Sequence, residues 1–489
     1  MANLQNTPLV RTQGLINGNW CTADSHQTFP IINPATGDII ATVADMGAAE
    51  TRRAIAAAAQ AQPLWAQKTA KERSQLLRAW FDLVMQHQEE LAQILTLEQG
   101  KPLTEARAEI AYGASYIEWF AEEAKRIYGD VIPAPGSDQR ILVIKQPVGV
   151  VATITPWNFP CAMLARKLAP ALAAGCTVVA KPASETPLSA LALVALAQEA
   201  GIPAGVVNVI IGKNSAEIGA ELTGNPVVRK LSFTGSTAVG KQLIQQCAAD
   251  VKRITLELGG NASFIVFDDA DLDAAVVGAM ASKFRNAGQT CVCANRFYIH
   301  RSVYAQFGEK LIAAMKTLSI GNGVDFGINI GPLISANAVN KVQRLVDDAL
   351  QKGARLGYQA VVGNVLSTGG YFYPPTLLFD VSPDAELNRQ EIFGPVAGLV
   401  VFDTDDEAIA LANNTEFGLA SYGYTRDAKR IKHLSEMLET GMLGINTGLI
   451  SNEMAPFGGI KQSGWGREGS HYGIDDYVNI KYICESFQA

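Results

Sequence analysis

The sequence lacks any apolar run of roughly 20 residues, the length that a helix needs to cross a bilayer. Residues 1–10 also lack the basic stretch and apolar core of a secretory signal. The seven cysteines are odd in number and irregularly spaced, which excludes the disulfide framework of small secreted proteins. We therefore expect a cytoplasmic protein without a membrane partner.

An excess of basic residues is absent as well, because the net charge is -7 and the isoelectric point is near 5.4. Proteins whose main partner is DNA or RNA usually present a basic surface, so we expect no nucleic-acid partner. The sequence contains no repeat of solenoid period and no low-complexity linker. Its 489 residues are enough for two or three domains, each with its own apolar core.

Two kinds of pattern divide the chain. Residues 47–128 are predicted to be helical, with a capping box at Thr69 and Glu72 and a helix end at Gly100. From residue 148 to 258, short apolar strand candidates alternate with helix candidates, which predicts a parallel sheet covered by helices. A second alternating series follows Asn261. Because ligands bind at the carboxyl ends of strands in such sheets, we expect the site in a cleft between two α/β domains.

Cys291 lies in residues 286–296, a segment of small and turn-forming residues that follows a helix candidate. Free cysteine is often an inert buried residue, so this segment alone does not identify a nucleophile. None of the five histidines has a sequence signature that links it to Cys291, which weakens the hypothesis of a cysteine hydrolase. Glu257 ends a strand candidate among apolar neighbours, where it is either structural or a general base of raised pKa.

Two further segments have the features of phosphate or ribose contacts. Residues 233–240 run from a strand through a glycine turn into a helix, whose free N-terminal amides can bind an anion. Lys181 ends another strand candidate, where it is either a ribose or phosphate ligand or a solvated charge. Neither segment matches the six-residue dinucleotide fingerprint with its trailing acid, so a nicotinamide cofactor would bind in a variant of that mode.

Four segments together resemble the aldehyde dehydrogenase superfamily in order and approximate spacing, and the resemblance extends over nearly the whole chain. They are residues 155–160, 255–261, 286–296 and 391–395. The resemblance implies the aldehyde dehydrogenase fold, with two Rossmann-like α/β domains: residues 1–125 with 148–258 for the cofactor, and 259–455 for catalysis. A small β-flap, residues 126–147 with 470–489, would join subunits into a homodimer or homotetramer, and residues 141–145 and 478–483 are its strand candidates.

The same resemblance implies that Cys291 attacks an aldehyde carbonyl while Asn158 and the Cys291 N–H hold the oxyanion. A hydride passes to the nicotinamide, and Glu257 then activates the water that hydrolyses the remaining thioester. No metal ion is implied. Ser184 removes the repulsion that a carboxylate would exert on a 2′-phosphate, which favours NADP over NAD. The residues implied for the cofactor are Trp157, Lys181, Ser184, Gly235, Ser236, Leu258, Glu391 and Phe393.

Additional positions resemble the succinate-semialdehyde dehydrogenase branch, which implies oxidation of succinate semialdehyde to succinate. In that branch two arginines and a serine, here Arg166, Arg285 and Ser451, hold the distal carboxylate by charge-assisted hydrogen bonds. The alternative for the arginines is an ordinary role as salt-bridge partners on helices. For the whole protein, the alternatives are glutarate semialdehyde or another small acid aldehyde as substrate, and a non-catalytic member of the fold.

Cys293 is a candidate redox partner of Cys291, because a disulfide between the two would block the nucleophile. In an extended segment their Cα atoms would lie about 7 Å apart, at or beyond the usual disulfide limit of roughly 6.8 Å. The loop would therefore have to bend for the pair to form.

Overall fold

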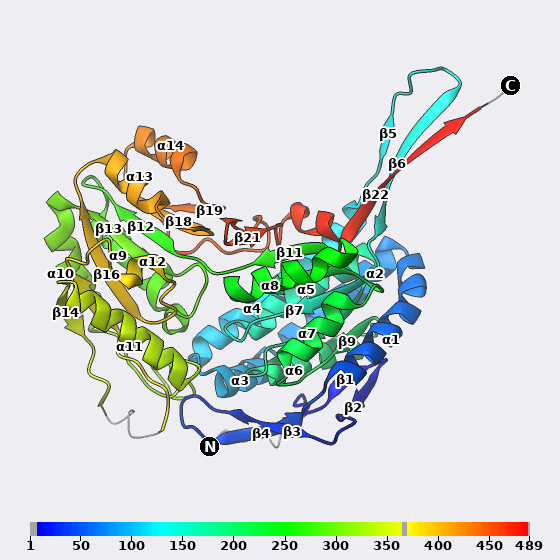
Figure 1. Ribbon diagram of the computed structural model, residues 1–489, viewed down its shortest axis with the longest axis horizontal. Coiled ribbons are helices and arrows are strands. Elements are labelled where there is room, and N and C mark those ends of the chain that lie inside the picture. Colours follow the sequence, from blue (N-terminus) through cyan, green and yellow to red (C-terminus); the bar gives the residue numbers. More distant parts are fainter. Residues whose placement is uncertain (1–6, 364–368, 488–489) are drawn as a thin grey trace.

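The chain builds two large sheets with their covering helices and a narrow arm that projects from one of them (Figure 1). This computed structural model describes residues 7–363 and 369–487. The ends of the predicted cofactor domain and flap, residues 1–6 and 488–489, lie outside the described residues, as do residues 364–368 of the predicted catalytic domain.

The first sheet has eight strands in the order β2-β1-β9-β8-β7-β10-β11-β21. The five from β9 to β11 are parallel, as the alternating pattern predicts, whereas β1, β2 and β21 add antiparallel edges that the pattern does not reveal. The strands are β1 (Gly14–Ile16), β2 (Asn19–Cys21), β7 (Val150–Ile154), β8 (Thr177–Lys181), β9 (Val207–Val209), β10 (Val228–Thr234), β11 (Arg253–Glu257) and β21 (Gly464–Trp465).

The helices around this sheet confirm the predicted helical region. Thr69 caps a helix and exchanges hydrogen bonds with Glu72, and Gly100 ends another with a left-handed φ of 94°. Every residue of α5 is buried, because this helix lies between the sheet and α4. Among the described residues, no helix has the length and apolar character to cross a membrane. The helices are α1 (Ala48–Gln67), α2 (Ala70–Gln86), α3 (Gln88–Gln99), α4 (Leu103–Glu123), α5 (Pro160–Ala174), α6 (Pro187–Glu199), α7 (Ser215–Gly224) and α8 (Thr237–Cys247).

The second sheet has seven strands in the order β14-β15-β16-β13-β12-β18-β19, and all except β14 are parallel to their neighbours. Its strands are β12 (Ala262–Val266), β13 (Ala294–His300), β14 (Arg355–Gln359), β15 (Thr376–Phe379), β16 (Val396–Phe402), β18 (Ala420–Tyr424) and β19 (Met442–Ile445). Its helices are α9 (Leu272–Phe284), α10 (Tyr304–Met315), α11 (Ala336–Gln351), α12 (Glu386–Arg389), α13 (Asp405–Asn413) and α14 (Ala428–Met437). A separate hydrophobic core, which includes Phe267, fills this half of the molecule.

The remaining elements are short. Two antiparallel strand pairs lie outside the large sheets: β3 (Thr28–Ile32) with β4 (Ile39–Ala44), and β17 (Phe417–Gly418) with β20 (Ile460–Lys461). The 3-10 turns include η2 (Ala124–Arg126), η3 (Ala248–Asp250), η4 (Arg285–Gly288), η5 (Arg301–Val303) and η7 (His471–Tyr477).

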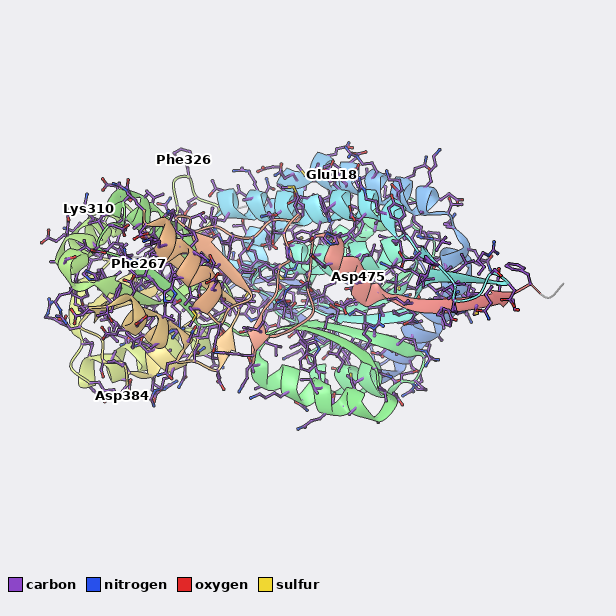
Figure 2. All side chains as sticks on the ribbon, turned by 90° about the horizontal axis from the view of Figure 1, so that it is seen from above. Glu118, Phe267, Lys310, Phe326, Asp384 and Asp475 are labelled. Carbon is purple, nitrogen blue, oxygen red and sulfur yellow. The ribbon has the colours of Figure 1, made fainter. Side chains whose placement is uncertain are left out.

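The projecting arm is an antiparallel sheet in the order β22-β6-β5 and contains both predicted flap strands. It consists of β5 (Asp130–Ile132), β6 (Gln139–Pro147) and β22 (Val478–Ser486), and it extends beyond the rest of the chain in both views (Figures 1 and 2). Val131, Ile480 and Tyr482 on this arm are 77%, 72% and 62% exposed. The arm therefore presents apolar side chains that the rest of the chain does not cover.

Trp80 joins the helical layer to the first sheet's helices and provides a test of this packing. It is fully buried, and its Nε1 donates a hydrogen bond to the Leu193 carbonyl in α6 at 3.0 Å. Trp80→Ala leaves a cavity and a buried carbonyl without its donor, so we expect a loss of about 3 to 5 kcal/mol in unfolding free energy. The measurement is urea unfolding followed by circular dichroism. Phe326→Ala is the control, because this side chain is fully exposed (Figure 2), and an equal loss in both variants would contradict the packing role.

Candidate active site

The candidate residues of the first half lie at the carboxyl ends of neighbouring parallel strands. Thr234 at the end of β10 is in register with Glu257 at the end of β11, and Ile154 at the end of β7 is in register with Lys181 at the end of β8. Parallel strands end at one edge of a sheet, so segments more than 70 residues apart in sequence meet there. The loop after β7 carries Asn158 to the same edge.

A cavity of about 350 Å³ lies along this edge, facing the second half of the molecule. Eight of the predicted site residues line it: Cys291, Asn158, Trp157, Gly235, Ser236, Leu258, Glu391 and Phe393. The other lining residues are Pro156, Met163, Glu185, Thr234, Gly259, Ile334, Ser335, Ala338 and Lys341. Lys181, Ser184, Glu257, Arg166, Arg285 and Ser451 do not line it.

A tight turn before Cys291 places this residue at the cavity. Asn286, Ala287 and Gly288 all have a left-handed φ, at 51°, 53° and 77°. A Cβ on Gly288 would lie 2.2 Å from the Gly394 carbonyl oxygen, so only glycine permits the loop to pack on the 391–395 segment. The two segments that the sequence analysis selects separately are thus in direct contact.

Cys291 carries its proton at neutral pH in this structure. Burial, followed by the nearby Glu391 carboxyl, raises the pKa of its thiol to about 12, although Arg166 and Arg285 act in the opposite direction. No histidine is among the residues that line the described cavity. A cysteine and histidine pair of the hydrolase type is therefore not formed there.

Asn158 is held firmly against the Cys291 loop. Its side-chain Nδ2 donates to the Gln289 carbonyl at 3.0 Å. Its backbone carbonyl accepts from Lys101 Nζ at 2.8 Å and from Asn286 Nδ2 at 3.0 Å. An amide nitrogen has two hydrogens, so the second hydrogen of Nδ2 is free for a ligand in the cavity. Lys101 in turn forms a fully buried ion pair with Glu109, whose Oε1 accepts from the Cys161 amide at the start of α5.

Glu257 is 3% exposed, and its Oε2 has no hydrogen-bond partner among the described residues. Burial raises the pKa of this carboxyl well above its usual range, and the charge of Glu468 raises it further despite the nearby Arg166 and Lys167. The group therefore holds a proton at pH values where an exposed glutamate is ionised. A carboxyl of this kind suits general acid and base chemistry.

Other residues of the cavity lining come from both halves of the molecule. The Trp157 and Phe393 rings meet edge to face at 5.4 Å between centroids. Glu391 Oε1 accepts from the Gly260 amide at 3.0 Å, and burial raises the pKa of this carboxyl to about 7. Ser236 caps α8, where its Oγ accepts from the Val239 amide at 3.4 Å.

Lys181 and Ser184 lie beside the cavity lining. Lys181 is buried, which lowers its pKa to about 8, and its Nζ donates to the Pro182 carbonyl at 3.3 Å. Ser184 Oγ donates to Glu185 Oε2 at 3.2 Å, and Glu185 does line the cavity. Glu185 is therefore a site residue that the sequence analysis missed, although its position next to Ser184 was a usable signal.

The three candidate carboxylate ligands lie in different environments. Arg166 is fully buried in α5, where its Nε pairs with Glu468, so the predicted alternative of a salt bridge is present for this residue. Its Nη1 and Nη2 have no partner among the described residues. Arg285 is partly exposed, with its guanidinium carbon 5.3 Å from the centre of the Phe159 ring. Ser451 is partly exposed in the loop after β19.

Cys293 points away from the cavity. It is 6% exposed, and its Sγ donates to the Lys283 and Ala294 carbonyls at 3.5 and 3.6 Å. The segment bends here, as its turn-forming residues predict, because the Cys293 amide donates to the Thr290 carbonyl at 3.1 Å and closes a turn. Both cysteines are free thiols here, and the redox role of Cys293 stays a prediction.

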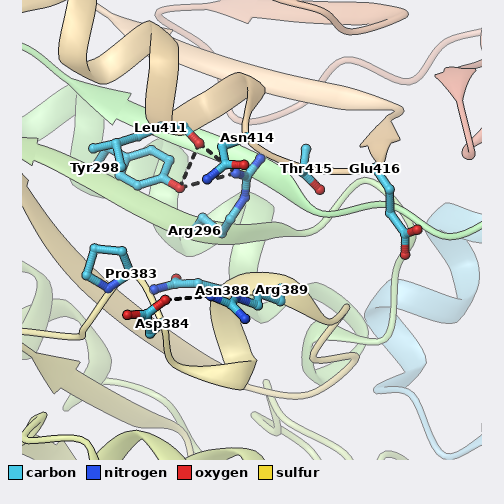
Figure 3. A pocket seen from close by; sticks show the side chains of 10 residues that line it. All are labelled: Arg296, Tyr298, Pro383, Asp384, Asn388, Arg389, Leu411, Asn414, Thr415 and Glu416. Atoms are coloured by element: carbon cyan, nitrogen blue, oxygen red, sulfur yellow. Dashed lines mark hydrogen bonds and ion pairs between the residues drawn. The ribbon is translucent and has the colours of Figure 1, made fainter.

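A second cavity of about 350 Å³ lies between β13, α12 and α13, away from the predicted site residues (Figure 3). Arg296 on its wall already donates to the Leu411 and Ala412 carbonyls at 2.9 and 2.8 Å, and Arg389 pairs with Asp384. Its main cations are thus occupied. The described residues contain no group of three or more histidine, cysteine, aspartate or glutamate side chains arranged to hold a metal ion.

Comparison with known proteins connects this arrangement to a family. Residues 20–483 match the model of the aldehyde dehydrogenase family. The chain is 60% identical to a glutarate-semialdehyde dehydrogenase of Pseudomonas putida over 485 residues, which cover 99% of each chain. It is also 60% identical to an NADP-dependent succinate-semialdehyde dehydrogenase of Escherichia coli over 481 residues, 98% of this chain and 99% of that one.

Solved structures agree with the sequence comparison. The crystal structure of an NADP-dependent enzyme of Escherichia coli superposes with a TM-score of 0.96 and 59% identity, covering 98% of this chain and 99% of that one. The aldehyde dehydrogenase fold that the sequence motifs predict is thereby confirmed. The chain belongs to the aldehyde dehydrogenase family.

Proposed function

We propose that this protein oxidises succinate semialdehyde to succinate with NADP or NAD as the acceptor. The main support has two parts. Cys291 lies in a cavity lined by six of the eight residues implied for the cofactor, and Arg166 is a buried guanidinium whose two Nη atoms lack a hydrogen-bond partner among the described residues. A carboxylate is the ligand that satisfies such a fork best. Glutarate semialdehyde is the second candidate, because relatives named for the two substrates are equally similar to this chain.

The proposed reaction begins with attack of Cys291 Sγ on the aldehyde carbon, while the carbonyl π pair moves to oxygen and the thiol proton passes to water. The free Nδ2 hydrogen of Asn158 and the Cys291 N–H stabilise the oxyanion, and loss of one such donor typically costs about 3 to 4 kcal/mol of barrier. A hydride then leaves the same carbon, so that a thioester remains on Cys291. Ionised Glu257 removes a proton from the attacking water, and hydrolysis releases the acid and restores the thiol.

The residues along the cavity fit a dinucleotide. The N-terminus of α8, which Ser236 caps and Gly235 precedes, suits a phosphate. Glu391 and Phe393 would contact the nicotinamide end, and Lys181 and Ser184 the adenosine ribose. Trp157 would line the same pocket. The cofactor, when bound, accepts the hydride. Ser184 supports NADP because it can donate to a 2′-phosphate, although here it donates to Glu185.

We also propose that the projecting arm binds a second copy of the chain in a homodimer or homotetramer. Its exposed apolar strands, with Val131, Ile480 and Tyr482 largely uncovered, support an interface. A strand edge at the end of a three-stranded sheet also offers free backbone groups for pairing.

Initial rates with six pairs of aldehyde and cofactor identify the preferred substrate and the preferred cofactor. The aldehydes are succinate semialdehyde, glutarate semialdehyde and 4-methylpentanal, whose isopropyl group replaces the carboxylate of the first, each with NADP and with NAD. We expect the highest kcat/KM for succinate semialdehyde with NADP, and only about 1 to 3 kcal/mol of discrimination against the longer acid aldehyde. The highest kcat/KM for 4-methylpentanal would rule out an acid-aldehyde enzyme.

Arg285→Ala tests the second arginine of the proposed carboxylate site. A hydrogen bond to a charged group contributes about 1.5 to 3 kcal/mol, so kcat/KM for succinate semialdehyde should fall by about 10- to 150-fold. The value for 4-methylpentanal and the alkylation rate of Cys291 should hardly change. Arg301→Ala is the matched control, because Arg301 forms an exposed ion pair with Asp403. An unchanged preference in Arg285→Ala would reject this role.

Glu257→Gln tests the proposed base. Because burial raises the pKa of Glu257, its ionised and proton-accepting form is present only above that raised pKa, and wild-type kcat should rise with pH through it. The amide variant should still release a burst of about one reduced cofactor per subunit but hydrolyse the thioester about 10²- to 10⁴-fold more slowly. Stopped-flow absorbance between pH 6 and 9 measures both. Steady turnover at the wild-type rate would exclude Glu257 as the base.

A further inference from the structure

Glu468 connects α5 with the loop that carries Ser451. Its backbone exchanges two hydrogen bonds of 2.8 Å with Phe457, one in each direction. Its side chain is buried, with one carboxylate oxygen accepting from Arg166 Nε and the other from Lys167 Nζ. One residue thus contacts Arg166 and the end of the Ser451 loop at Phe457, which lie 302 and 11 residues from it in sequence.

The contact with Glu468 fixes the direction of the Arg166 guanidinium. The group is planar, so an anchor at Nε determines where Nη1 and Nη2 lie. The Phe457 ring faces the guanidinium, with its centre 4.0 Å from the central carbon, and the Tyr116 ring lies 5.7 Å from it. Burial disfavours the cation, but the Glu468 charge opposes this effect and keeps the pKa of Arg166 above its usual range. Arg166 is therefore a buried, oriented cation with one end unoccupied.

Hydrogen bonds also connect the loop of residues 451–457 to the segment of residues 468–470. The Ser470 amide donates to the Glu453 carbonyl at 2.7 Å, and the Phe457 pair with Glu468 holds the other end of the loop. Tyr116 in α4 also holds this loop, because its hydroxyl donates a hydrogen bond to the Asn452 carbonyl at 3.2 Å. A shift of Glu468 would therefore disturb the Ser451 loop together with the Arg166 fork.

We propose that Glu468 is a positioning residue that orients the Arg166 fork and the 451–457 loop, and so sets the preference for aldehydes with an anionic far end. This inference rests on the proposed function. Glu468 itself is an acceptor and repels the substrate carboxylate, so it acts only through its partners. Its charge leaves Arg166 cationic while occupying only the Nε edge, which keeps the other edge for substrate.

Glu468 also affects the proposed base, and this effect can be distinguished from its effect on the orientation of Arg166. Its charge contributes to the raised pKa of Glu257, so its loss would alter the proposed base. A change in the base affects thioester hydrolysis, and hence kcat, for every aldehyde. A change in the Arg166 fork affects KM, and only for substrates with a carboxylate. The ratio of kcat/KM between succinate semialdehyde and 4-methylpentanal therefore reports on positioning alone.

The test is Glu468→Gln, which keeps the size of the side chain but removes its charge and one of its two acceptors. We expect the preference ratio to fall about tenfold or more, through a higher KM for succinate semialdehyde, while KM for 4-methylpentanal stays within about threefold. Succinate should also inhibit more weakly by a similar factor. Glu439→Gln is the matched control, since Glu439 forms a half-exposed ion pair with Lys461.

Phe457→Leu is the second variant, for use if Glu468→Gln does not fold as judged by Tm and NADPH binding. It removes the ring that faces Arg166 but retains the backbone pairing with Glu468, and we expect a smaller fall in the same ratio, about threefold. A wild-type ratio near one would reject the proposed function itself. A high wild-type ratio that persists in the folded variant, or a fall in kcat equal for both aldehydes, would overturn the role of Glu468.

Discussion

Parallel strands all end at one edge of their sheet, and the site of this protein depends on that constraint. The hydrogen-bonded ladders that join β8, β7, β10 and β11 bring Lys181, Asn158, Ser236 and Glu257 to the same edge. The second half of the molecule then closes the cavity with Cys291, and glycine at position 288 lets the left-handed turn before this residue pack against the 391–395 segment. Each later step of the proposed chemistry requires this convergence.

Buried charge is the second feature that organises the site. The Lys101 and Glu109 pair has no exposed side-chain surface, and Arg166 and Lys167 share Glu468 in a similarly dry environment. Removing one member of such a group is far more costly than the net contribution of the intact pair, because a buried charge is left without a partner. The arrangement therefore suits orientation: Lys101 holds the Asn158 carbonyl, and Glu468 holds Arg166.

Local sequence predicted much of the fold because its signals act over short distances. Local patterns predict the capping box at Thr69, the αL glycine at position 100 and the two flap strands, and all are present in the structure. The short antiparallel strands β1, β2 and β21 are not predicted, because a strand of two or three residues shows no readable period and pairs only through the completed sheet.

The sequence by itself determined the candidate reactive groups, Cys291, Glu257 and Asn158, and the motifs that place this chain in its family. Their chemistry is a property of residue type and order, which local spacing preserves. Only the tertiary structure decided which of them share a cavity, how far burial moves their proton affinities, and that Glu468 lies against Arg166. These features depend on the distances between segments up to 302 residues apart and on how far the fold excludes water from them. No local sequence pattern encodes either.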